Sequence, residues 1–220
     1  MCRVLDDGEV TVQVGIIGAG NVGHALGLAS VRAGHEVRIS ASQPSEAESV
    51  AQEVGAQPAG SNAESIQGAD VVILAVPFEA VEEITSELGS ALNGKVVIDV
   101  TNRFAPEQLD GPSNAERTQM LVPDARVVKA FNTIFAANQS EPSVDGVQLD
   151  GFVAGDDAAA KDTVISLVES MGFRAVDTGP LAMARALEGM GVLNISLNAS
   201  KGWPWKSGWK LVGPTEPAQA

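Results

Sequence analysis

The chain of 220 residues contains one cysteine, no tyrosine and two histidines. With Cys2 alone, an internal disulfide and a thiolate metal cluster are both excluded. His24 and His35 lie 11 positions apart, which is not a metal-ligand spacing, so we expect no metal site. The absence of tyrosine removes the tyrosine–lysine couple with which many short-chain reductases protonate a carbonyl group.

Basic residues are also scarce, and long apolar runs are absent. The chain has 14 Lys and Arg against 28 Asp and Glu, a net charge of -14, so we expect neither a nucleic-acid partner nor an anionic membrane surface. No apolar run approaches the length of about 20 residues that a helix needs to cross a bilayer. The N-terminal MCRVLDDGEV carries acids where a signal peptide would carry basic residues. The sequence therefore predicts a cytoplasmic protein.

Apolar segments of strand length alternate with segments of helical periodicity. Strands are predicted at residues 12–17, 36–40, 70–76, 95–100 and 126–131, and helices after residue 21 and at 46–54. The strands are almost wholly apolar, as expected when both faces of a parallel sheet are buried. This pattern predicts an α/β fold of the Rossmann type, with a doubly wound, mainly parallel sheet.

A shorter alternation follows, with strands predicted at 151–154 and 173–176 and helices at 157–171 and 181–199. We expect a dinucleotide-binding domain at 12–135 and a small C-terminal α/β extension at 150–211, packed on the same sheet, for substrate binding or dimerisation. Residues 1–11 and 213–220 are expected to be flexible tails, and 110–123 a mobile surface connection.

The sequence Gly18-Ala19-Gly20-Asn21-Val22-Gly23 is a G-x-G-x-x-G motif between a predicted strand and a predicted helix. In that context Gly18 allows the tight turn, Gly20 lets a pyrophosphate approach the backbone, and Gly23 lets the helix pack against the strand. The helix N-terminus then offers free N–H groups and a positive dipole end. The motif predicts a dinucleotide site.

The choice between NAD and NADP depends on the end of the second strand, where an acid indicates NAD. The chain has Ser40-Ala41-Ser42 there and no acid, which favours NADP without excluding NAD. Ser40 and Ser42 could donate hydrogen bonds to a 2′-phosphate. Arg38 is either a further partner of that phosphate or a residue on the face of the strand.

Five segments together carry a family resemblance: GIIGAGNVGHALGLASVRAGHEV, ADVVILAVPFEAVEEI, VVIDVTN, VVKAFNTI and FVAGDDAAAKDTVISLVESMGFRAVDTGPLAMARALE. Their order resembles that of the NADP oxidoreductases that depend on the deazaflavin coenzyme F-420 (F420), over about residues 12–211. The dinucleotide-binding domains of STEAP-type ferric reductases and of pyrroline-carboxylate reductases are similar. One departure is Ala41-Ser42, where the family pattern has a Ser-Arg pair.

The resemblance implies hydride transfer between the nicotinamide C4 of NADP(H) and the deazaflavin C5, with no protein nucleophile. Carried over by position, the glycine motif would hold the pyrophosphate and residues 40–42 would lie at the adenosine 2′ position. Val76 and Pro77 would lie beside the nicotinamide ribose. Asn102 and residues 132–134, which include the candidate catalytic residues Asn132 and Thr133, would line the face where the second ring binds. A turn-capping role for Asn132 and Thr133 is the alternative.

Three features leave alternatives open. The segment 201–210 holds all three tryptophans, three lysines and no acid, so it could bind a flat anionic ligand or anchor a homodimer. Lys129 is either a functional ammonium or a salt-bridged lysine. The acceptor could instead be a small imine or carbonyl compound, or the protein could be a non-catalytic NADP(H) sensor.

Overall fold

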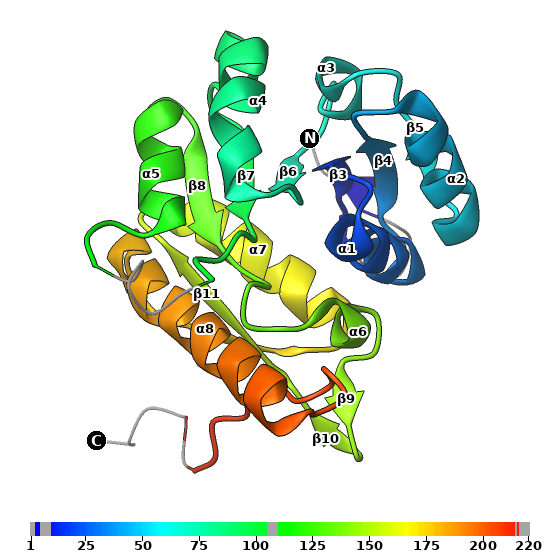
Figure 1. Ribbon diagram of the computed structural model, residues 1–220. Coiled ribbons are helices and arrows are strands. Elements are labelled where there is room, and N and C mark those ends of the chain that lie inside the picture. Colours follow the sequence, from blue (N-terminus) through cyan, green and yellow to red (C-terminus); the bar gives the residue numbers. More distant parts are fainter. Residues whose placement is uncertain (1–2, 5–9, 105–109, 214, 216–220) are drawn as a thin grey trace.

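The computed structural model describes residues 3–4, 10–104, 110–213 and 215, and within them an eight-stranded sheet in the order β12-β11-β8-β7-β6-β3-β4-β5 (Figure 1). The strands are β3 (Gln13–Ile17), β4 (Glu36–Ser40), β5 (Gln57–Pro58), β6 (Val71–Leu74), β7 (Val96–Asp99), β8 (Arg126–Lys129), β11 (Asp150–Gly155) and β12 (Arg174–Asp177). The helices are α1 (Asn21–Arg32), α2 (Pro44–Val54), α3 (Asn62–Ser65), α4 (Val81–Leu88), α5 (Asn114–Leu121), α6 (Ala136–Gln139), α7 (Ala158–Ser170) and α8 (Ala184–Lys201). Two short hairpins, β1–β2 (Arg3–Val4 and Val10–Thr11) and β9–β10 (Ser143–Val144 and Val147–Gln148), lie outside this sheet.

The six strands from β8 to β5 are mutually parallel. Strand β11 pairs antiparallel with β8, and β12 is parallel to β11. The predicted α/β class, with a doubly wound and mainly parallel sheet, is confirmed. Because the parallel strands end at the same edge, the loops that follow β3, β6, β7 and β8 meet there.

Both faces of the sheet are buried, which explains why the strands are apolar throughout (Figure 1). On one face Ile16 and Ile73 pack with Leu26 of α1 in a cluster that also includes residues of α2 and α7. On the other face Leu74 packs in a cluster with Val81 of α4. Alternate residues of each strand therefore point to opposite layers of helices.

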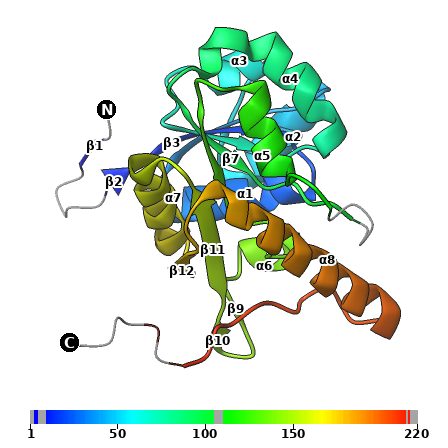
Figure 2. The same cartoon turned by 90° about the vertical axis from the view of Figure 1, so that its left-hand side faces the viewer.

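The chain from β11 to α8 extends the same sheet. Leu187 of α8 packs with Phe152 of β11, together with Trp209 from the segment after the helix. Figure 2 shows α8 beside β11. This arrangement places one side of α8 next to the edge where the parallel strands end.

Two sequence expectations need correction. Residues 110–123 do not form an irregular connection: they contain α5, which begins with a capping box between Ser113 and Glu116. The last helix starts at Ala184 rather than 181, after a 3-10 turn at Leu181–Met183, and continues to Lys201. The predicted flexible tails, 1–11 and 213–220, fall largely outside the described residues.

Candidate active site

The turn after β3 has the geometry that its glycines predict. Gly18 has a φ of 110°, and a Cβ there would lie 2.3 Å from the carbonyl oxygen of Ala75. A Cβ on Gly23 would lie 1.9 Å from the carbonyl oxygen of Gly18. Neither position can carry a side chain unless the backbone shifts, so these glycines set how closely α1 approaches the turn.

Gly20 has a different role because its surroundings are open. A Cβ there would meet nothing within 4 Å. Gly20 is also the N-cap of α1, and no side chain caps the helix and no acid occupies its first turn. The first N–H groups of α1 therefore face free space, where a pyrophosphate can accept their hydrogen bonds. The residues present fit a dinucleotide.

A cleft of about 560 Å³ lies at the edge where the parallel strands end. It brings together eight of the predicted site residues: Gly20, Asn21, Val22, Val76, Pro77, Asn102, Asn132 and Thr133. Gly18 and Ala19 lie in the turn beside it, and Gly23 lies in the first turn of α1. The structure thus places the glycine motif and the loops after β6, β7 and β8 around a single cavity.

Asn102 and Asn132 hold each other across the cleft wall. The Asn102 Nδ2 donates to the Asn132 carbonyl oxygen at 2.8 Å, and the Asn132 Nδ2 donates to the Asn102 Oδ1 at 2.9 Å. The Asn132 amide also donates to the Leu187 carbonyl oxygen of α8 at 3.0 Å. Gly191 allows α8 to lie this close, since a Cβ there would be 2.5 Å from the Asn102 Oδ1. The pair joins the loops after β7 and β8 to α8.

Three buried polar atoms of cleft residues have no hydrogen-bond partner among the described residues: Asn132 Oδ1, Thr133 Oγ1 and Gln139 Oε1. Asn132 is 6% exposed and Thr133 is 3% exposed. A buried polar atom without a partner costs free energy, so such atoms are suited to a ligand with matching groups. A carboxamide, which has both N–H donors and a carbonyl acceptor, would satisfy them.

The lining of the cleft contains no ionisable side chain among the described residues. It consists of backbone groups, side-chain amides, the two threonines Thr101 and Thr133, and apolar side chains such as Phe78, Ile134 and Ile195. Such a lining can orient a ligand and exclude water. Among the described residues this lining has no Asp, Glu, His, Lys or Arg with which to exchange a proton.

A buried charge cluster lies directly behind this lining. The Lys129 Nζ lies 3.0 Å from the Asp99 Oδ1 and 2.9 Å from the Glu188 Oε1, and all three side chains are fully buried. The Arg103 Nε donates to the Glu188 Oε2 at 2.6 Å. Lys129 is therefore the salt-bridged lysine of the two alternatives. Its Nζ also donates to the carbonyl oxygen of Thr101, a cleft residue, so the cluster supports the wall from behind.

The residues predicted for the adenosine 2′ position lie apart from the cleft, at the end of β4. Ser40 is fully buried, and its hydroxyl contacts the Asn62 Oδ1 at 2.9 Å and the Ser65 Oγ at 3.2 Å. The structure therefore does not present the Ser40 hydroxyl to a ligand, whereas Ser42 is exposed and Ala41 half-buried.

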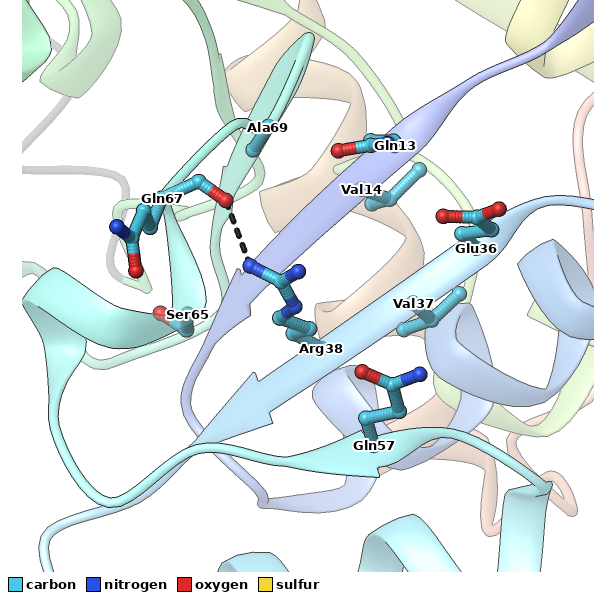
Figure 3. A pocket seen from close by; sticks show the side chains of 9 residues that line it. All are labelled: Gln13, Val14, Glu36, Val37, Arg38, Gln57, Ser65, Gln67 and Ala69. Atoms are coloured by element: carbon cyan, nitrogen blue, oxygen red, sulfur yellow. Dashed lines mark hydrogen bonds between the residues drawn. The ribbon is translucent and has the colours of Figure 1, made fainter. Parts of the chain in front are cut away.

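Arg38 does not reach the end of β4. Figure 3 shows its guanidinium directed to the carbonyl of Gln67, to which the Arg38 Nη1 donates at 2.6 Å. The hollow around it, between β3 and β4, has a volume of only about 50 Å³. Of the two interpretations, Arg38 is the residue on the face of the strand.

Several cleft residues were not predicted from the sequence. Phe131, two residues after the end of β8, is fully buried with a φ of 61°, a conformation that non-glycine residues rarely adopt. Phe135 follows it, while Gly191, Asn194 and Trp205 come from the C-terminal part. Only the cluster of tryptophans gave a signal for this contribution.

The fold and the cleft together define a Rossmann-type dinucleotide-binding protein. The family model described as "NADP oxidoreductase coenzyme F420-dependent" matches residues 13–103. An F420-dependent NADP reductase from Methanothermobacter marburgensis is 34% identical over 206 residues, covering 82% of this chain and 89% of that protein. The chain belongs to this family, as the order of its sequence motifs predicted.

Two further relatives agree with the assignment. The metalloreductase STEAP3 from Rattus norvegicus is 34% identical over 182 residues, but the chain spans only 36% of that protein's length. A crystal structure of a candidate F420-dependent NADP-reductase from Arthrobacter sp. FB24 has a TM-score of 0.82 and 27% identity, covering 92% of this chain and all of that one. In the described part of the present chain, no helix is long and apolar enough to cross a membrane.

Proposed function

We propose that this protein is an oxidoreductase that transfers a hydride between NADP(H) and the deazaflavin coenzyme F420. The observation that carries the proposal is a cleft with a dinucleotide turn at one end and no ionisable side chain in its described lining. Family membership supports it, because relatives of similar length are named F420-dependent NADP reductases.

The absence of an ionisable group distinguishes the possible acceptors. Reduction of a carbonyl or imine group leaves a charged atom that an enzyme must protonate, and the described lining offers no such acid. When bound, NADP(H) supplies the hydride, which passes between the nicotinamide C4 and the deazaflavin C5. Hydride transfer to the deazaflavin C5 leaves a negative charge that is delocalised over its pyrimidine ring and can take its proton from solvent. The protein then needs to hold the two rings together but needs no acid of its own in the cleft.

We assign the roles of the cleft residues as follows. The N–H groups that follow Gly20 bind the pyrophosphate, and the space above Gly20 admits it. The unpartnered Asn132 Oδ1 and Thr133 Oγ1 bind and orient the nicotinamide carboxamide. Val76 and Pro77 pack beside the nicotinamide ribose. Asn102 keeps Asn132 in place through their paired amides.

We assign NADP rather than NAD as the preferred cofactor. No acid directly follows β4 to receive the hydroxyls of an adenosine ribose, and the exposed Ser42 after this strand supports a site for a 2′-phosphate. Because the Ser40 hydroxyl is used inside the protein, Ser42 is the serine that we expect to contact the phosphate.

We also propose a cytoplasmic homodimer. The exposed apolar side chains of Leu193 on α8, Met183 before it and Trp203 after it support a self-association surface in the C-terminal part. Sedimentation of the purified protein at several concentrations tests the dimer.

The reaction is tested with purified protein, oxidised F420 and either NADPH or NADH, by following the loss of the deazaflavin absorbance. Rapid bleaching with NADPH and slower bleaching with NADH is the expected result. Bleaching with NADH alone would overturn the cofactor assignment. Binding of NADPH with no bleaching would overturn the deazaflavin assignment, and assays with small imines and carbonyl compounds would then separate a different reductase from a redox sensor.

Thr133→Val tests the assigned site without disturbing the fold. The Thr133 hydroxyl has no partner among the described residues, so its removal should leave the melting temperature unchanged while the Kd for NADPH rises. Thr85→Val is the matched control, because Thr85 is equally buried but its hydroxyl donates to the Val81 carbonyl of α4. Thr85→Val should lower stability and leave NADPH binding unchanged.

A further inference from the structure

The three tryptophans of the C-terminal segment lie in three different environments. Trp209 is partly buried and packs against the core residues Phe152 and Leu187. Trp203 and Trp205 are each 44% exposed, but only Trp205 is among the residues that line the cleft. The segment therefore does not act as a uniform apolar surface: one tryptophan belongs to the site.

The backbone at Trp205 is held in an unfavourable conformation. Its φ is 58°, in the left-handed region that favours glycine. The Trp205 N–H donates to the Asn198 Oδ1 at 3.1 Å, and the Asn138 Nδ2 donates to the next carbonyl, that of Lys206, at 2.9 Å. Ser207 is fixed in turn, since its hydroxyl donates to the Asn194 Oδ1 at 2.6 Å. Such over-determined strain is typical of functional sites.

The far end of the segment is anchored at Asp150, a fully buried residue of β11. The Lys210 Nζ donates to the Asp150 Oδ1 at 2.9 Å, and the Leu211 N–H donates to its Oδ2 at 2.6 Å. Burial acts to raise the pKa of Asp150, but the hydrogen bonds from Arg174, Leu211 and Lys210 outweigh it and hold that pKa below its ordinary value. The segment is thus tied down on both sides of Trp205.

The indole ring of Trp205 is oriented by Phe135. The two ring centroids are 5.5 Å apart with an angle of 73° between the planes, an edge-to-face contact. Phe135 follows Thr133 and Ile134, which line the same cleft. A large, flat and partly open aromatic surface therefore stands at the cavity that Thr133 also lines.

From these contacts we infer that Trp205 is the aromatic surface on which the planar heterocycle of the hydride acceptor stacks, and that it selects flat acceptors over small aliphatic ones. This inference rests on the proposed function, because it names the residue that binds the second ring. An indole ring loses little conformational freedom on binding and presents a π-face to any flat heterocycle. The strain at Trp205 is the cost of holding that ring at the cleft.

The test compares Trp205→Ala with Trp203→Ala, which removes the same side chain, at the same exposure, from a position outside the cleft. Calorimetry gives the Kd for oxidised F420 and for NADPH with each variant. Trp205→Ala should raise the Kd for F420 by about tenfold or more, while the Kd for NADPH changes by less than about twofold. Trp203→Ala should change neither by more than about twofold, and Trp205→Phe should retain most of the F420 affinity.

Two results would overturn the inference. One is an equal loss of F420 affinity in Trp203→Ala and Trp205→Ala. The other is a loss of NADPH affinity as large as the loss of F420 affinity, which would mark Trp205 as a structural residue. Melting temperatures of the variants identify any loss of fold, and Trp205→Phe supplies the answer if the alanine variant is unstable.

The failure of the proposed function gives a different result. If the wild-type protein neither binds nor reduces F420, that function is wrong, and flavin mononucleotide, which also has a flat tricyclic ring, becomes the probe. Weaker flavin binding in Trp205→Ala than in Trp203→Ala would still support the stacking surface. If the wild-type protein binds neither ring system, the inference about Trp205 is overturned as well.

Discussion

Replacing Lys129 with methionine should destabilise the protein strongly, because Lys129 is the centre of a buried charge cluster. Its Nζ lies within 3.0 Å of oxygens of both Asp99 and Glu188, and all three side chains are fully buried. With Arg103 the cluster holds two positive and two negative charges. Methionine has about the volume of lysine, but Lys129→Met leaves one buried negative charge without a positive partner.

The magnitude follows from the burial. Removing one partner of a buried ion pair costs about 3–5 kcal/mol, because the remaining charge cannot be hydrated. Asp99 would keep the hydroxyls of Thr101 and Thr118 as donors, and Glu188 would keep Arg103, so we expect the lower half of that range. For a chain of this size such a loss lowers the melting temperature by about 6–16 °C.

Urea unfolding of four proteins measures the effect: the wild type, Lys129→Met, Asp99→Asn and the double variant. The double variant removes one charge of each sign, so it should be more stable than Lys129→Met. Lys161→Met is the matched control, since its partner Asp177 is 47% exposed and the loss should be under about 1 kcal/mol. The reasoning is refuted if Lys129→Met costs no more than Lys161→Met, or if the double variant loses the sum of the two single losses.

Three further predictions concern the cofactor site and acid stability. Gly20→Ala should leave the melting temperature nearly unchanged but raise the Kd for NADPH roughly tenfold. Gly23→Ala should lower the melting temperature and also weaken NADPH binding, because its Cβ would lie 1.9 Å from a carbonyl oxygen. Calorimetry and thermal melts separate the two variants. Ser42→Asp should reverse the ratio of kcat/KM for NADPH to that for NADH in favour of NADH, because a carboxylate repels the 2′-phosphate; an unchanged ratio would place the phosphate elsewhere. The hydrogen bond from Arg185 lowers the pKa of Glu116 from 4.5 to about 2, so the stabilisation is complete above pH 4.5 and is lost as the pH falls towards 2. The stability difference between the wild type and Glu116→Gln, measured by urea unfolding, should therefore shrink across that range; a constant difference would contradict the ion pair as its source.

Some features of this protein could be predicted from the sequence because they depend on local chemistry. A glycine is required at Gly18 and Gly23 wherever a strand turns this tightly into a helix, and the motif shows that requirement directly. The unbroken apolar strands predicted a sheet buried on both faces, because burial repeats along each strand. The loops after β6, β7 and β8 were expected at the cleft because parallel strands end at the same edge of a sheet.

Other features depend on neighbours that are distant in the chain. Residues 110–123, predicted to be a mobile surface connection, contain α5, and Arg185 of α8 pairs with Glu116 of its capping box. Ser40 occupies the expected strand end, but Asn62 and Ser65 draw its hydroxyl inward.

The site itself illustrates the same division. The sequence places Asn132 and Thr133 after a strand, but their unpartnered atoms can be recognised only once the surrounding loops and α8 are in place. The sequence shows Trp205 only as one of three tryptophans in an unusual segment. The tertiary structure shows that it lines the cleft, whereas Trp203 and Trp209 do not. Backbone conformation follows largely from short-range sterics and hydrogen bonds, whereas side-chain partners follow from the packing of the whole chain.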